Sequence, residues 1–318
     1  MTAAAEFLAR AGWGDARLVP LAGDASARRY ARLTGPAGRA ILMQDPGGDV
    51  ARFARLARYL TGLGLSAPRI LAEDHAAGLL LLEDLGDGLI ARLATDPETE
   101  TRLYLAATDA LIALHAAPPA PDLPVATPDR LALMTDLAFT HYAGLPGAAP
   151  EAAALFEPLL RAHAAAAEVT ILRDYHAENI LDLPDRRGAA RAGLLDFQDA
   201  MVGHRAYDLV SLLHDIRRRV GPQASAACIA RYLAATGQDG AAFDVAFHLL
   251  GAQRNLRILG VFARLATDHA KPRYLALLPA VWDRLQHELR HPVLAPLRGF
   301  LDRVLPAPDA ALIERLRR

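Results

Sequence analysis

The sequence predicts an α+β fold with two lobes: a small N-terminal antiparallel sheet with one helix, and a larger, mainly helical C-terminal lobe. Short apolar runs separated by turn residues fill the first part of the chain, whereas long helical patterns dominate after Gly88. The length of 318 residues also exceeds the ~250 to 300 residues at which a single hydrophobic core stops growing. We therefore expect an N-terminal lobe at residues 1–85 and a C-terminal lobe at residues 86–318.

The N-terminal lobe is expected to begin with an amphipathic helix within residues 1–10, followed by an antiparallel meander. Asp49 can cap a later helix, because Val50, Phe53 and Leu60 then fall on one face. Glycine, aspartate and proline separate the apolar runs and mark the turns. The expected strands span residues 18–21, 29–33, 40–44, 70–72 and 79–83, and the helix between them runs to about residue 62.

The C-terminal lobe is expected to be helical, with one interruption. Residues 98–115 have the clearest helical pattern, and the proline-rich stretch 118–128 after it predicts a loop. Residues 169–183 and 192–200 instead predict short strand–loop–strand elements that carry acidic and amide side chains. These two segments are therefore the first place to look for chemistry.

The composition excludes several classes of protein. The formal net charge of −1 provides no positive footprint for nucleic acid or an anionic membrane. The apolar runs are shorter than the ~20 residues that a membrane-spanning helix needs. The single cysteine, Cys228, excludes an intrachain disulfide and a cysteine-rich zinc site. We expect a cytoplasmic monomer with a small-molecule substrate and neither nucleic-acid nor membrane partners.

One set of polar residues has the spacing of a phosphoryl-transfer centre. Asn179 follows Asp174 by five residues, and Asp196 follows Asn179 by seventeen, at the end of an apolar run. Phosphoryl transfer needs a carboxylate that orients or deprotonates the attacking hydroxyl, and oxygen ligands that hold Mg²⁺ against the phosphates. The alternative is that these side chains only cap turns.

The segment Arg173-Asp174-Tyr175-His176-Ala177-Glu178-Asn179, with Leu195-Asp196-Phe197, resembles the aminoglycoside phosphotransferase and choline kinase-like family. The usual loop of that family reads roughly His-Gly-Asp-Leu-His-x-x-Asn, followed by Ile-Asp-Phe or Ile-Asp-Trp. Arg173 and Tyr175 depart from this pattern. The resemblance implies a protein-kinase-like two-lobed fold and the use of ATP and Mg²⁺.

The resemblance also implies a role for each matching residue. Asp174 corresponds to the catalytic base, and Asn179 and Asp196 correspond to the Mg²⁺ ligands. His176 and Asp208 correspond to residues that structure the catalytic loop. Asp199 is either a second metal contact or a solvated turn residue.

The nucleotide phosphates are expected to lie under the loop between the first two main strands, residues 23–29. Ser26, Arg28 and Arg29 are the candidates for contact with phosphate. The alternative is that the two arginines alternate between the faces of a strand, one in solvent and one paired with an acid. By its position, the segment 80–86 is the expected hinge that reads adenine, with Glu83 and Leu85 as candidate contacts.

The lysine that kinases place on their third strand is missing. Met43 stands at its position, the only lysine of the chain is Lys271, and the helix after Asp49 contains no glutamate to pair with such a lysine. Three explanations remain: an arginine substitutes, backbone donors and Mg²⁺ carry the phosphate charge, or the chain is a nucleotide-binding pseudokinase. The intact acidic centre argues against the last.

The segments 23–30, 43–46 and 253–265 resemble the cell-wall-recycling branch of the family, whose members phosphorylate N-acetylmuramate and N-acetylglucosamine at the anomeric hydroxyl. An acidic sugar needs a cation for its carboxylate, and polar groups for its hydroxyls. The candidates are Arg254, Asn255, Arg257 and Arg264, which alternatively form a solvated helix face. An aminoglycoside or another small molecule remains the alternative acceptor, although aminoglycosides favour clustered carboxylates that the C-terminal segments lack.

Overall fold

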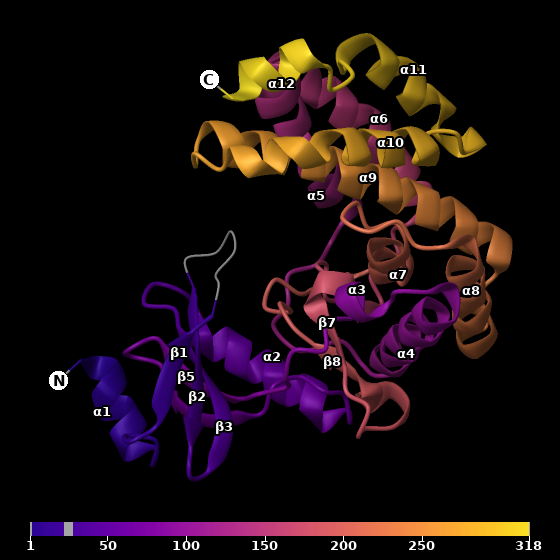
Figure 1. Ribbon diagram of the computed structural model, residues 1–318. Helices are drawn as coiled ribbons and strands as arrows, with labels where there is room; N and C mark the ends of the chain where they lie inside the picture. The colour runs from indigo at the N-terminus through magenta and orange to yellow at the C-terminus, as the bar shows by residue number, and fades with distance from the viewer. Residues whose placement is uncertain (1, 22–27, 318) are drawn as a thin grey trace.

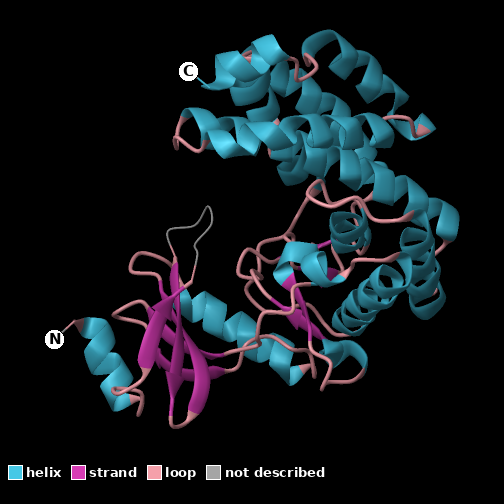
Figure 2. Ribbon diagram, viewed as in Figure 1, coloured by secondary structure: helices cyan, strands magenta, loops and turns pink. Residues whose placement is uncertain are grey.

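The computed structural model describes residues 2–21 and 28–317 and confirms the α+β fold. Figures 1 and 2 show a twisted sheet at one end of the molecule and helices through the rest. The predicted boundary after residue 85 falls in the connection between the last strand of the sheet and the first helix of the helical part. No described helix is long and apolar enough to cross a membrane.

The sheet has five antiparallel strands in the order β1-β2-β3-β5-β4. The predicted strands are all present, and β2 and β4 continue two residues further than expected. Helix α2 begins where the sequence predicts, since the Asp49 carboxylate accepts the N–H of Arg52 at 2.8 Å. The bounds are α1 Ala3–Arg10, β1 Arg17–Pro20, β2 Arg29–Gly35, β3 Gly38–Gln44, α2 Val50–Gly62, β4 Ile70–Asp74 and β5 Leu79–Glu83.

The two faces of the sheet belong to different hydrophobic clusters. Leu42 and its neighbours on one face pack with α1 in a small satellite core. Met43 and Leu80 on the opposite face join α2 and the helical part in one large core. Alternation along β3 therefore places Met43 inside the protein, where it is 0% exposed.

The segment after α2 ties the sheet to a strand of the helical part. The N–H of Leu194 donates to the carbonyl of Ser66 at 2.8 Å. The guanidinium of Arg52 in α2 donates to the carbonyl of Ala200 at 2.9 Å. Helix α2 consequently lies between the sheet and the helical part (Figure 1).

The helical part contains two small antiparallel sheets of two strands each, β6 with β9 and β7 with β8. The predicted strand region 192–200 is thus β8 and a loop, and β9 follows it. The bounds are α3 Ile90–Leu93, α4 Pro97–His115, α5 Pro128–Leu133, the π-helix η1 Ala138–Ala143, η2 Pro146–Ala148, α6 Ala149–His163, β6 Val169–Ile171, η3 Ala177–Asn179, β7 Ile180–Asp182, η4 Gly188–Arg191, β8 Ala192–Leu194, β9 Met201–Gly203, α7 Ala206–Leu213, α8 Pro222–Thr236, α9 Gly240–Thr267, η5 Pro272–Leu277, α10 Leu278–Glu288, η6 Pro292–Leu294, α11 Ala295–Val304 and α12 Ala310–Arg317.

Helix α9 organises this part of the molecule, because it contacts α6, α7, α10 and η1 along its length. Asp239 caps its first turn by accepting the N–H of Ala242 at 2.8 Å. Gly260 allows the closest approach, since a Cβ there would lie 2.2 Å from the carbonyl carbon of Leu137. The backbone of η1 thus packs directly against α9.

Candidate active site

The loop between β6 and β7 is held by hydrogen bonds to the buried carboxylate of Asp208. The backbone N–H groups of Leu172 and Arg173 donate to the two oxygens of Asp208 on α7, at 2.5 and 2.8 Å. Arg173 adopts a φ of 70°, which side-chain-bearing residues rarely adopt. Asp208 is 0% exposed, so these bonds are made inside the protein. Asp208 lies where the sequence predicts a loop-structuring residue.

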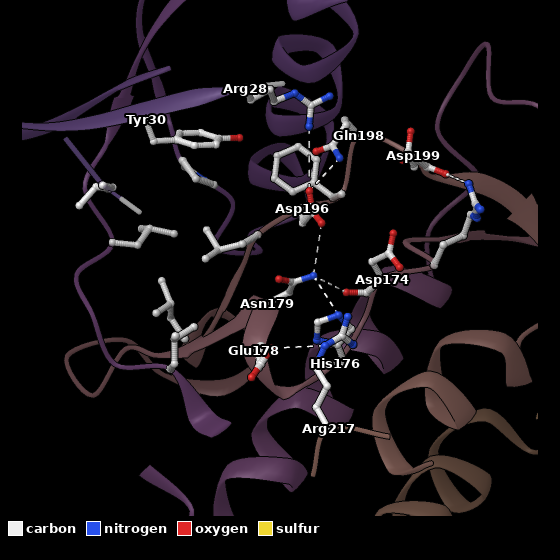
Figure 3. Close-up of a pocket in the computed structure, with 18 of the residues that line it drawn as sticks. Arg28, Tyr30, Asp174, His176, Glu178, Asn179, Asp196, Gln198, Asp199 and Arg217 are labelled. Atoms are coloured by element: carbon white, nitrogen blue, oxygen red, sulfur yellow. Dashed lines mark hydrogen bonds and ion pairs between the residues drawn. The ribbon is translucent and has the colours of Figure 1, made fainter. Parts of the chain in front are cut away.

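The three predicted reactive residues converge in one place. The amide nitrogen of Asn179 donates to the backbone carbonyl of Asp174 at 2.9 Å and lies 3.5 Å from a carboxylate oxygen of Asp196. His176 lies beneath, with its Nε2 3.3 Å from the same amide nitrogen. Figure 3 shows Asp174, Asn179 and Asp196 side by side at the cleft.

Asp196 reaches the cleft because of the backbone just after β8. The N–H of Leu195 donates to the carbonyl of Asn179 at 3.0 Å, and Asp196 then turns outward with a φ of 55°. Aspartate tolerates this left-handed conformation better than most residues. The side chain of Asp196 is 47% exposed and accepts a hydrogen bond from Gln198 at 2.8 Å.

Burial and neighbouring charges perturb this centre. Burial and the nearby carboxylate of Asp196 raise the pKa of Asp174. Burial raises the pKa of Asp208 to about 7, although its two backbone hydrogen bonds act in the opposite direction. Burial lowers the pKa of His176, which is therefore a neutral ring at physiological pH.

The donor set fits a magnesium ion. Asp196 and Asn179 offer oxygen ligands, the type that Mg²⁺ prefers, and few protein ligands suffice when phosphates supply the rest. The amide nitrogen of Asn179 is engaged with the carbonyl of Asp174, which leaves the amide oxygen for a cation. A cation here also offsets the repulsion between Asp174 and Asp196 that is evident in the raised pKa of Asp174.

A cation of the protein itself lies on the sheet side of the centre. The Nε of Arg28 donates to the carboxylate of Asp45 at 2.9 Å, and its Nη1 lies 4.0 Å from Asp196. Figure 3 shows the guanidinium of Arg28, the residue before β2, extending toward Asp196. Met43, at the position of the missing lysine, is buried and takes no part.

A cleft of ≈930 Å³ contains the centre and extends along the sheet. Arg28, Glu83 and Leu85 line it, as the sequence predicts for the nucleotide side. Glu83 is held by Arg186 at 2.7 Å and by Arg69 at 3.1 Å. Arg29 is exposed and does not line the cleft, and Ser26 lies outside the described residues.

The predicted acceptor residues on α9 separate into two groups. Arg254 and Arg257 line the cleft, and the guanidinium of Arg254 lies 5.8 Å from the centre of the Tyr207 ring. Burial and the neighbouring Arg173 lower the pKa of Arg257. Asn255 and Arg264 do not line the cleft. Of the two, Asn255 is 1% exposed, so it faces the helical core.

Several cleft residues were not anticipated from the sequence. Arg173 lines the cleft beside Asp174 and donates to the carbonyl of Asp199 at 3.2 Å. Arg217 lines it too, 3.4 Å from Glu178. The partner of Arg28, Asp45, is found only through the pairing of β2 and β3, because that pairing places residue 29 opposite residue 44. The available signals were the departure of Arg173 from the usual loop and the family resemblance of the segment 43–46, which contains Asp45.

The geometry agrees with comparisons to known proteins. The model of the phosphotransferase enzyme family matches residues 17–246. The chain is 43% identical to an N-acetylmuramate/N-acetylglucosamine kinase of Caulobacter vibrioides over 96% of each protein. It is 31% identical to a kinase of the same name from Pseudomonas aeruginosa, over 93% of this chain and 92% of that one.

Solved structures share the fold at lower identity. A choline/ethanolamine kinase family protein from Mesorhizobium loti superposes with a TM-score of 0.62 at 18% identity, covering 95% of this chain and 92% of that one. An aminoglycoside-3'-phosphotransferase of type VIII superposes with a TM-score of 0.54 at 20% identity, covering 78% and 98%. With its acidic centre intact, the chain belongs to the phosphotransferase enzyme family.

Proposed function

We propose that the chain is an ATP- and Mg²⁺-dependent sugar kinase that phosphorylates the anomeric hydroxyl of N-acetylmuramate and N-acetylglucosamine. The observation that supports this most strongly is that Asp174, Asn179 and Asp196 converge in a cleft that cationic side chains also line. Relatives that cover nearly the whole chain bear the name of this activity, which supports the choice of acceptor.

Asp174 is the group that orients the attacking hydroxyl and accepts its proton. Burial, the largest cause of its raised pKa, favours that acceptance, because a more basic carboxylate holds the proton better. Asn179 and Asp196 hold Mg²⁺, which when bound offsets the negative charge of the phosphates. His176 and Asp208 keep the loop in the conformation that brings Asp174 to the cleft.

On the nucleotide side, Arg28 takes the place of the missing lysine and Asp45 takes the place of its acidic partner. The Arg28–Asp45 bond fixes the guanidinium near Asp196, where it would contact the phosphates of a nucleotide held through Mg²⁺ on Asp196. The backbone around Glu83 and Leu85 reads adenine at the end of the sheet. Ser26 remains a proposed phosphate contact, whereas Arg29, which is exposed and does not line the cleft, is not assigned one.

On the acceptor side, Arg254 and Arg257 provide the positive charge that the carboxylate of N-acetylmuramate requires. The lowered pKa of Arg257 reflects burial beside another arginine, a situation that an anion relieves. Asn255 faces the helical core and can act only through its neighbours, whereas Arg264 is half-buried and close enough to Arg257 to influence it by charge. We propose that the enzyme works as a monomer in the cytoplasm.

The test offers Mg-ATP with N-acetylmuramate, N-acetylglucosamine and kanamycin in separate reactions, and identifies products by phosphorus NMR. We expect a sugar 1-phosphate from both amino sugars and no turnover of kanamycin. Asp174→Asn is expected to remain folded and to lose at least ~100-fold in kcat. Product formed only from kanamycin, or normal turnover by Asp174→Asn, would refute the proposal.

Arg28 and Arg29 form a matched pair for the nucleotide side, since they are adjacent and carry the same charge. Arg28→Met is expected to raise KM for ATP by ~10- to 100-fold, the loss of a charge-assisted hydrogen bond to phosphate. Arg29→Met serves as the exposed control and is expected to change KM for ATP less than threefold. Equal effects of the two substitutions would remove Arg28 from its assigned role.

A further inference from the structure

Four histidines and a glutamate gather where the ends of α7, α9 and α10 meet. This histidine cluster consists of His214, His248, His287, His291 and Glu288. None of its members lines the cleft of the active site. The ring centres of neighbouring histidines in the cluster lie 5.2 to 6.1 Å apart. The proposed sugar kinase reaction does not use any of them.

Glu288 is the centre of the cluster and is 0% exposed. Its two carboxylate oxygens form hydrogen bonds with Nδ1 of His214 at 2.5 Å and with Nδ1 of His248 at 2.7 Å. The chain makes room for the carboxylate with Gly251 on α9, because a Cβ there would lie 2.7 Å from the carboxyl carbon. A carboxylate at such a depth needs strong partners, since burial strongly disfavours its charged form.

His248, His287 and Glu288 each offer one ligand atom, and these three atoms all lie within 4.8 Å of one another. Ligands of a tetrahedral zinc ion, bound at ~2.0–2.1 Å, lie ~3.4 Å apart, so closing the set takes small side-chain rotations. His287 is exposed and can make that movement, whereas Glu288 is held by the core.

We infer that this cluster binds one divalent transition-metal ion of the zinc class, with His248, His287 and Glu288 as its ligands. Two imidazoles and one carboxylate are a ligand set that suits Zn²⁺ and its neighbours, and it is a poor one for Mg²⁺, which prefers oxygen ligands. The site is therefore chemically distinct from the magnesium centre at Asp196.

The surroundings supply the outer contacts that metal ligands usually have. Asp244 lies 3.6 Å from Nε2 of His248 and 3.4 Å from Nε2 of His291, and it orients both rings. His214 keeps the second oxygen of Glu288 engaged. Binding of the ion through Nδ1 of His248 requires the ring hydrogen to lie on Nε2, the nitrogen that faces Asp244.

One charge acts against the ion. The guanidinium of Arg284, one turn before Glu288, interacts with the same carboxylate. Arg284 consequently competes with the ion for the charge of Glu288, and it is expected to weaken binding of the ion. The bound ion joins α9 to α10, and the resulting stabilisation rises with metal concentration.

The experiment uses the full chain, stripped of metal by a chelator and free of any polyhistidine tag, with no nucleotide present. Calorimetric titration with Zn²⁺ and the thermal unfolding midpoint are the two measurements. We expect one Zn²⁺ per chain and a higher midpoint with Zn²⁺ than with equimolar Mg²⁺. His287→Gln removes an exposed ligand without disturbing the core, and it is expected to weaken binding by at least ~10-fold.

His163, exposed at the end of α6, provides the matched control, and His163→Gln is expected to bind like the unaltered chain. His248→Gln is the second ligand variant and is expected to weaken binding as much as His287→Gln. The inference is overturned if the chain binds no Zn²⁺, or if neither ligand variant binds more weakly than His163→Gln. The result does not depend on the sugar kinase activity.

Discussion

Replacing Asp208 by alanine removes the acceptor that holds the catalytic loop. Two buried backbone N–H groups, of Leu172 and Arg173, then lose their partner. A buried donor without an acceptor costs ~1–3 kcal/mol, so two such donors cost ~2–6 kcal/mol. Alanine also removes a desolvated carboxyl group, whose burial is itself unfavourable. We therefore expect a loss of stability in the lower half of that range, ~2–4 kcal/mol.

Urea unfolding measures this loss directly, because the midpoint shifts while the slope stays constant when only stability changes. A domain with a stability of ~5–15 kcal/mol remains folded after such a loss. Asp208→Asn retains one acceptor oxygen and is expected to lose about half as much stability. Both variants are also expected to lower kcat. Arg173, next to Asp174, has a positive φ, and the hydrogen bonds to Asp208 stabilise that backbone conformation.

Glu100→Gln separates loop positioning from general stability. Glu100 is another buried carboxylate that accepts a backbone N–H, that of Gly221 at 2.9 Å, and it pairs with Arg218 at 2.8 Å. It is expected to lower the urea midpoint and to leave kcat unchanged. The reasoning about Asp208 fails if Asp208→Ala loses less than ~1 kcal/mol, or if its kcat matches that of Glu100→Gln.

Two further predictions concern the helical part. Gly260→Ala forces α9 and the backbone of Leu137 apart by about 1.2 Å, and the unfolding midpoint is expected to report a loss of ~1–3 kcal/mol. Gly299→Ala, with open space around it, is expected to be neutral or stabilising, and equal midpoints for the two would contradict this packing. Burial lowers the pKa of His115 from 6.5 to about 3. As the pH falls below 6.5, His115 therefore becomes protonated in the unfolded chain and stays neutral in the folded chain. The free energy of unfolding is expected to fall by ~2 kcal/mol between pH 7 and pH 5. His115→Gln, which replaces the partner of Tyr232, is expected to remove that part of the pH dependence of urea unfolding, and an unchanged dependence would show that His115 is protonated when folded.

The fold and the acidic centre could be predicted because their signals are local. Strands of the sheet are short apolar runs bounded by turn residues, and Asp49 marks the start of α2. The Asp174, Asn179 and Asp196 spacing is a property of one loop and one hairpin, and the hairpin of β7 and β8 brings the ends together. These relations need no knowledge of distant packing.

The sequence does not show which acid pairs with Arg28 or which residues of α9 face the cleft, because both depend on tertiary packing. Arg28 meets Asp45 only because of the register between β2 and β3. Helical spacing groups Arg254 with Arg257, yet it does not say which neighbouring positions turn inward, and Asn255 does so. The histidine cluster brings His214 and His248 to the segment 287–291, and the H-E-x-x-H spacing of His287, Glu288 and His291 indicates only that last part of it in the sequence.

The hydrogen bond between Ser66 and Leu194 of β8 limits how the cleft can open and close. The Ser66 carbonyl accepts the N–H of Leu194, two residues before Asp196, and Arg52 bonds to the carbonyl of Ala200 just beyond it. A rotation of the sheet together with α2 and the segment after it, as one rigid body, would break both bonds and open the shared core. The sheet and Asp196 are therefore expected to move together, and adaptation to differently shaped sugars is expected to fall to the opposite side of the cleft, which α9 lines.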